Sequence, residues 1–129
     1  MKVLITGITG LLGSIVAADV HAAGHEVIGV SRSNSKDMFD FPVEIKVQDL
    51  ADLPLSKTLL DHIDILIHCA ANTNMGSLED KEQSKINEGS VQELVSLAIA
   101  AKVKRFILSD FKFYTSVLRS SSFSNIKLS

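Results

Sequence analysis

Three glycines near the amino end have the spacing of a turn that binds phosphate. Gly7, Gly10 and Gly13 stand three residues apart, where the commonest fingerprint reads Gly-x-Gly-x-x-Gly. The first would let the chain reverse sharply, the second would let bare main chain approach a pyrophosphate, and the third would let a helix pack closely. The N-terminus of such a helix directs unpaired N–H groups at the anion. The alternative is a tight turn that binds nothing, because glycine triplets also occur by chance.

A strand and a helix are expected on either side of these glycines. Residues 2–6 are a short apolar run with β-branched side chains, which is typical of a buried strand. Beyond the turn, apolar residues recur at helical spacing from Leu12 to Val20, and Gly24 stands where a left-handed C-cap belongs. Together they predict the first half of a βαβ unit that binds a dinucleotide. A secretory signal is the alternative for the apolar stretch after Met1, but Thr and Gly residues interrupt that stretch, so we favour the βα unit.

The composition predicts one globular domain in the cytoplasm. With 129 residues, of which 46% are hydrophobic, the chain is long enough for a core of its own. No apolar run approaches the ~18 residues of a membrane span, and a net charge of −2 favours neither nucleic acid nor an anionic membrane as a partner. Cys69 is the only cysteine, which excludes an internal disulfide and fits a reducing compartment. No further ligands are patterned near His21 and His25, so no metal site is expected.

The second strand is expected to end in residues that select the cofactor. Residues 25–30 predict a strand, and Ser31 and Arg32 follow it where an Asp or Glu would accept hydrogen bonds from ribose hydroxyls. A guanidinium makes bidentate contacts with phosphate, so Arg32 indicates NADP(H). The alternative for Arg32 is a solvated arginine in the loop of residues 31–40.

A third strand is expected to end at a possible adenine site. Residues 43–47 alternate between apolar and polar and predict this strand, with Asp49 and Leu50 at its C-terminal end, where open α/β sheets bind ligands. Asp49 would accept a hydrogen bond from the adenine amino group, and Leu50 would pack near the ring. Alternatively, Asp49 is a turn or helix-cap residue. Residues 55–62 then predict a short amphipathic helix.

The fourth strand is predicted by a compact apolar run at residues 64–68. Ala70 and Ala71 follow it, and such small residues would let a cofactor's ribose or nicotinamide lie against the main chain. We expect His68 to be a histidine at the edge of the core, not a catalyst. Cys69 is expected to be a small buried hydrophobe, not a nucleophile.

A long helix and a fifth strand complete the pattern. Ser77 begins a sequence that resembles a capping box, and apolar residues recur at helical spacing in the second half of the segment that follows. Asn87, in the same segment, is a site residue if it faces a cleft and a solvated residue if it does not. Residues 102–109 predict a basic turn and a strand, whereas residues 111–129 are rich in serine and show no clean period.

In this order the motifs resemble the extended short-chain dehydrogenases/reductases, the group that includes the NAD-dependent epimerase/dehydratase family. The segments that carry the resemblance are Thr6 to Gly13, Asp49-Leu50, His68 to Ala71, Asn87 and Val103 to Ile107. The resemblance implies an α/β fold, a doubly wound parallel sheet of the Rossmann type with about five strands in the order 3-2-1-4-5. Members of the group are considerably longer, so we expect an NAD(P)-binding domain at residues 1–110, truncated before the sixth strand, and a divergent tail at residues 111–129.

The resemblance also implies where each part of the cofactor lies. The pyrophosphate would lie on the glycine turn, the adenosine at the ends of the second and third strands, and the remainder along the end of the fourth. The implied cofactor-binding residues are Gly7, Thr9, Gly10, Leu11, Leu12, Gly13, Ser31, Arg32, Asp49, Leu50, Ala70, Ala71 and Asn87. NADP is the expected cofactor and NAD the alternative.

The catalytic motif of the group is missing. In the group, a Ser or Thr follows the fifth strand, and a later Tyr-x-x-x-Lys supplies an acid/base whose lysine lowers the tyrosine's pKa. Here the only tyrosine is Tyr114, with Leu118 four places on, and Ser109 fits the serine position poorly. The resemblance therefore implies a relative of enzymes that transfer a hydride on a carbonyl compound or nucleotide sugar, which itself binds the dinucleotide and catalyses little.

Two other functions stay open from the sequence. The missing motif favours a non-catalytic module that senses NADP(H) or pairs with a partner through an uncovered sheet edge, for example as a homodimer. A flavodoxin-like domain of other function is the blander alternative.

Overall fold

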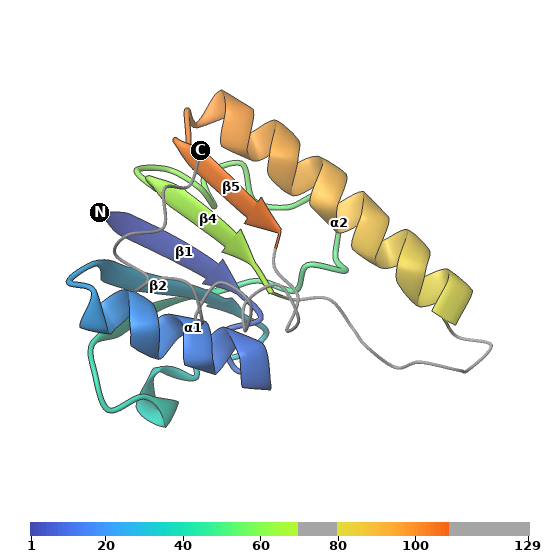
Figure 1. Ribbon diagram of the computed structural model, residues 1–129. Helices are drawn as coiled ribbons and strands as arrows, with labels where there is room; N and C mark the ends of the chain where they lie inside the picture. The colour runs from blue at the N-terminus through green and yellow to red at the C-terminus, as the bar shows by residue number, and fades with distance from the viewer. Residues whose placement is uncertain (70–79, 109–129) are drawn as a thin grey trace.

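A single sheet of five parallel strands organises the described part of the chain, with a helix on each face (Figure 1). The structure is a computed structural model that describes residues 1–69 and 80–108, with the backbone alone for residues 80–88. In chain order the elements are β1 Lys2–Thr6, α1 Leu11–Ala22, β2 Glu26–Ser31, the 3₁₀ turn η1 Lys36–Met38, β3 Val43–Val47, β4 Ile65–His68, α2 Asp80–Ala100 and β5 Arg105–Leu108.

The strand order is β3-β2-β1-β4-β5, which confirms the expected doubly wound arrangement. β1 lies at the centre and pairs in parallel with both β2 and β4. In such sheets the ligand crevice lies outside the carboxyl ends of the strands, at the point where the strand order reverses. Here that point is between β1 and β4. Thr6, the last residue of β1, is in register with Val30 of β2 and His68 of β4, so these three strands end at one level.

Alternate strand residues build two core clusters, one on each face of the sheet. Val3 and Ile5 of β1 lie in the cluster that contains Val16 of α1. Leu4 of β1 lies in the other cluster, with Leu94 of α2. Successive side chains of a strand point to opposite faces, and both faces are covered here. This explains why the sequence of β1 is almost continuously apolar.

Residues 55–62 do not form the helix that their sequence predicts. They form successive turns in which an N–H bonds to the carbonyl three residues earlier, as from Ile63 to Leu60 at 3.2 Å. In an α-helix the Leu59 carbonyl would accept from Ile63, but here it accepts a 2.8 Å hydrogen bond from the Lys46 ammonium of β3. The prediction was wrong because so short a segment gains little from helix formation. Its leucines are instead buried in the core cluster that contains Leu94 of α2, which we call the α2-side core.

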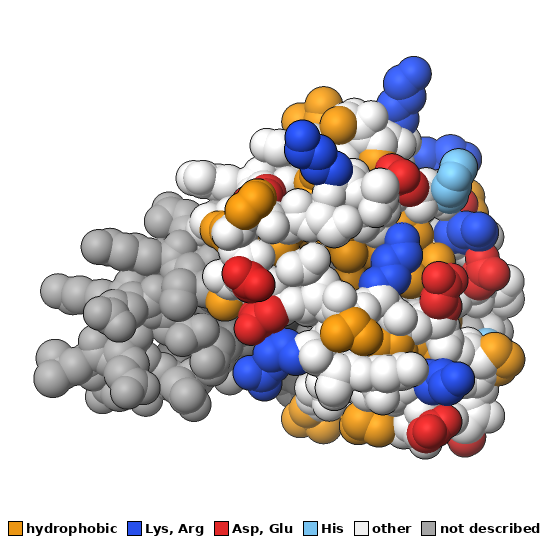
Figure 2. Space-filling model, turned by 180° about the vertical axis from the view of Figure 1, so that it is seen from behind, with side chains coloured by type: hydrophobic (Ala, Val, Ile, Leu, Met, Phe, Trp, Pro, Cys, Tyr) orange, Lys and Arg blue, Asp and Glu red, His pale blue; other side chains and the backbone are white. Residues whose placement is uncertain are grey.

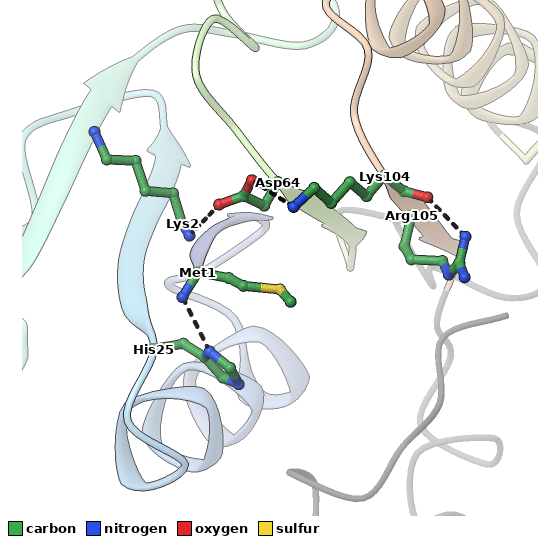
Figure 3. A network of polar contacts seen from close by, with 6 residues as sticks. All are labelled: Met1, Lys2, His25, Asp64, Lys104 and Arg105. Atoms are coloured by element: carbon green, nitrogen blue, oxygen red, sulfur yellow. Dashed lines mark hydrogen bonds and ion pairs between the residues drawn. The ribbon is translucent and has the colours of Figure 1, made fainter.

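The amino ends of the central strands are joined through Asp64 (Figure 3). Its carboxylate accepts a 2.8 Å hydrogen bond from the Lys2 backbone N–H and lies 3.7 Å from the Lys104 ammonium. The hydrogen bond from Lys2 lowers the pKa of the Asp64 carboxyl; partial desolvation opposes this shift, and the charge of Lys104 adds to it. This network lies at the end of the sheet opposite the crevice, so it joins strands and does not belong to the candidate site.

Charged side chains of both signs are interspersed on the surface. Figure 2 shows lysine and arginine next to aspartate and glutamate on the face seen from behind, with neither sign dominant. Within residues 1–69 and 80–108, no helix has the length and apolar character needed to cross a bilayer.

Candidate dinucleotide-binding site

The sheet gathers several of the predicted site residues along one edge. Gly7 follows β1, Ser31 ends β2 and Asp49 comes shortly after β3. The β2 and β3 ends are joined by a 2.8 Å hydrogen bond from the Gln48 N–H to the Ser31 carbonyl. Because parallel strands present their carboxyl ends at the same edge, the glycine turn, the β2 end and the β3 end form one continuous rim.

The glycine turn has the backbone conformation expected from its sequence. Gly7 has a φ of 65°, in the left-handed region that glycine adopts without strain. The chain then folds back so that the Gly10 N–H donates to the Gly7 carbonyl at 3.0 Å. Gly10 is the N-cap of α1, in extended conformation. The glycine turn is therefore followed directly by the first helical turn of α1.

Gly13 allows the closest approach in the site. A Cβ at this position would lie 1.9 Å from the Gly7 carbonyl oxygen and 2.8 Å from the Ile8 Cα. The sequence predicts close packing of the helix on the strand, but the contact made is with the turn itself. At Gly10, among the described residues, a Cβ would meet only the Gly7 oxygen, at 3.3 Å. Gly13 therefore shapes the turn, whereas Gly10 leaves its outer surface bare.

The start of α1 has the properties of an anion site. Gly10 has no side chain to cap the helix, and the first turn of α1 contains no acidic residue. The residues Thr9, Gly10 and Leu11 are exposed, and Leu12 is half-buried. No side chain of this first turn neutralises the positive end of the helix dipole, so the bare main chain fits a pyrophosphate.

A cation follows the end of β2, the strand that pairs with β1 just before this turn. Ser31 is half-buried, and its hydroxyl accepts a 3.4 Å hydrogen bond from the Ser33 N–H. Arg32 is exposed, and no carboxylate in the described ranges forms an ion pair with it. An arginine without a carboxylate partner keeps its full donor set for a phosphate.

Asp49 takes the turn role that its sequence position allows. One carboxylate oxygen accepts a 2.9 Å hydrogen bond from the Ala51 N–H, as in an Asx turn. The carboxylate is exposed, and its other oxygen has no donor among the residues that the structure describes. Leu50 is half-buried against the α2-side core. The second carboxylate oxygen of Asp49 thus remains an acceptor at the rim, next in the chain to the apolar Leu50.

The switch point between β1 and β4 contains a buried polar cluster. The Thr6 hydroxyl lies 2.6 Å from Nδ1 of His68 and accepts a 3.0 Å hydrogen bond from the Cys69 N–H. Burial lowers the pKa of His68 and raises the pKa of the Cys69 thiol to about 12. The histidine is therefore neutral and the thiol protonated near pH 7.

The side chains of three predicted site residues are not described. Ala70 and Ala71 lie outside the described residues, as do Ser77 and the tail from residue 111. Asn87 lies within α2, where only its backbone is described.

The sequence did not point to several buried residues that pack against the candidate site. Ile8 is fully buried beneath the glycine turn, and a Cβ at Gly29 of β2 would come within 2.7 Å of its side chain. An isolated glycine in a strand signals such a close approach, so Gly29 was a usable clue. Ser90 of α2 is also buried, at 3% exposure, and bonds to the loop after β3.

The fold defines a Rossmann-type α/β domain. Residues 3–110 match the NAD dependent epimerase/dehydratase family, and the chain belongs to this family. A nicotinamide dinucleotide is thus the cofactor that family membership assigns to the domain.

Several known proteins are similar to this chain. A probable low-salt glycan biosynthesis reductase (Agl14) of Haloferax volcanii is 34% identical over 85 residues, which cover 64% of this chain and 27% of that protein. The UDP-glucose 4-epimerase of Bifidobacterium longum, in complex with NAD+ and UDP, matches 85% of this chain and 37% of its own, with 24% identity and a TM-score of 0.73. The UDP-N-acetylglucosamine 4-epimerase of Bacillus cereus matches 84% and 34%, with 26% identity and a TM-score of 0.69. The chain spans 27% to 37% of the length of these proteins.

Proposed function

We propose that this chain binds NADP(H), in preference to NAD(H), on the rim formed by the glycine turn and the ends of β2 and β3. The observation that carries the proposal is the bare main chain at Gly10, which opens an uncapped helix next to Arg32. The turn N–H groups would hold the pyrophosphate. Arg32, with Ser31 beside it, would hold the 2′-phosphate of the adenosine ribose, since no acidic residue stands there to repel it.

The remaining roles follow the same rim. Asp49 would accept from the adenine amino group, and Leu50 would pack near the ring. Ala70, Ala71 and Asn87 are proposed to lie along the nicotinamide half of the cofactor. When bound, the cofactor supplies hydride chemistry at its nicotinamide ring, and the chain contributes binding and orientation.

An Arg32→Asp substitution tests the cofactor preference. Removing the guanidinium and adding a carboxylate should lower the ratio of NADP+ to NAD+ affinity by about 100-fold, because a charge-assisted contact is lost and a repulsion replaces it. Calorimetric titration of both dinucleotides measures this ratio. Lys102→Asp is the matched control. It makes the same charge change before the amino end of β5, at a residue with left-handed backbone conformation, which Asp tolerates. Equal ratios in the Arg32→Asp variant and the parent chain would mean that Arg32 is only a solvated loop residue.

We propose as a second candidate a cytoplasmic module that binds NADP(H) without turnover and pairs with a second copy. β5 is an edge strand in the described sheet, and its Leu108 is 61% exposed, so this edge is available for pairing. We expect no oxidation of NADPH with mixed aldehydes and nucleotide sugars, and a dimer in sedimentation velocity. Turnover would instead support a reductase or epimerase acting on such a substrate, and a monodisperse monomer would contradict the pairing.

A further inference from the structure

Ser90 is a buried polar side chain that joins α2 to the candidate adenine site. It is 3% exposed, and its hydroxyl donates a 2.6 Å hydrogen bond to the Leu50 carbonyl. Leu50 is the neighbour of Asp49, forty residues earlier in the chain. This bond is partly buried, and loss of the donor would leave the Leu50 carbonyl without the partner it has here, which is costly. The bond therefore restrains the main chain directly beside the Asp49 carboxylate.

Glu93 and Gly89, which lie close to Ser90 in α2, also contact the loop that contains Leu50. The Glu93 carboxylate accepts a 2.7 Å hydrogen bond from the Leu55 N–H. A Cβ at Gly89 would lie 3.3 Å from the Leu53 side chain, so the absence of a side chain there lets the loop lie close to the helix. Contacts within one helical turn of Ser90 thus span the loop from Leu50 to Leu55.

The loop is also restrained from the sheet side. The Gln48 N–H donates to the Ser31 carbonyl at 2.8 Å, and the Ala51 N–H donates to Asp49 at 2.9 Å. The main chain is therefore restrained before Asp49 by β2 and after it by Ser90.

We infer that Ser90 is a positioning residue for adenine recognition, which rests on the proposed function of the Asp49 rim. Through the Leu50 carbonyl, Ser90 sets the position of the Asp49 main chain and hence of its free carboxylate oxygen. That oxygen accepts from the 6-amino group of adenine and repels the 6-carbonyl oxygen that hypoxanthine has in its place. Ser90 thereby controls discrimination between adenine and other purines without touching the nucleotide.

The test compares ADP with inosine diphosphate, which differ at the purine 6-position. Calorimetry on the full chain should show that ADP binds more tightly than inosine diphosphate, and that Ser90→Ala lowers this preference by about tenfold. Ser90→Thr keeps the hydroxyl and should keep the preference. Ser96→Ala is the matched control, because Ser96 is an exposed serine of the same helix that bonds only to the Gln92 carbonyl of its own helix.

The outcomes separate this inference from the proposed function. Equal weakening of ADP and inosine diphosphate by Ser90→Ala, or no weakening, overturns the positioning role and leaves dinucleotide binding intact. A parent chain that binds ADP without preferring it overturns adenine recognition by Asp49. A parent chain that binds neither nucleotide overturns the proposed function together with the inference. If Ser90→Ala does not fold, Ser90→Cys, with a side chain of similar size and a weak donor, is expected to show the same loss of preference.

Discussion

A Gly13→Ala variant should lose most of its folding stability. At an ordinary helical position this change stabilises a protein by up to about 1 kcal/mol, because alanine is the better helix former. Here the new methyl group would lie 1.9 Å from the Gly7 carbonyl oxygen and 2.6 Å from its carbon. Both are main-chain atoms of a turn that cannot move without leaving its place at the end of β1. We expect destabilisation of at least about 3 kcal/mol, a large fraction of a typical domain's stability.

Chemical denaturation followed by circular dichroism measures this loss. Ser14→Ala, one position further along α1, is the matched control and should cost far less, since the Ser14 hydroxyl only bonds to the Leu11 carbonyl of the same helix. A Gly13→Ala midpoint equal to or above that of the parent chain would contradict the close packing of helix on turn. It would also remove the reason for a glycine at this position.

A Gly10→Val variant should fold and yet fail to bind a dinucleotide. The backbone at Gly10 is extended, with φ −77° and ψ 173°, which valine adopts without strain. Of the atoms in the described part of the chain, its Cβ would meet only the Gly7 oxygen, at 3.3 Å, so a shift of a few tenths of an ångström relieves the contact. The branched side chain would then cover the main-chain N–H groups at the start of α1. Loss of two hydrogen bonds to a charged phosphate lowers affinity by about 100-fold or more.

Calorimetric titration of NADP+ and NAD+ measures this affinity, and thermal unfolding followed by circular dichroism checks that the variant is folded. Ala18→Val adds bulk to the exposed side of the same helix, away from the turn, and should bind like the parent chain. Retained affinity in a folded Gly10→Val protein would show that phosphate does not lie on this main chain. The proposed function would then lose the observation on which it depends.

The sequence by itself determined the elements that local patterns encode. The five strands and the helix that follows Gly10 lie where the apolar runs and glycines predict them. A continuously apolar strand requires two covered faces, and a glycine at a left-handed position requires a turn. These rules act between neighbours in the chain, so they can be read without knowing the fold. The strand order was implied by the resemblance carried by the same motifs.

Only the tertiary structure decided the contacts between distant segments. Residues 55–62 have the apolar spacing of a helix, but they form turns. The Lys46 ammonium donates to the Leu59 carbonyl, and the leucines of this segment are buried in the core. The bond from Ser90 to Leu50 crosses forty residues, and no periodicity in α2 indicates it. Such contacts depend on which surfaces the sheet brings together. The free energy of burial and of satisfied carbonyls is gained only after the chain has closed around them.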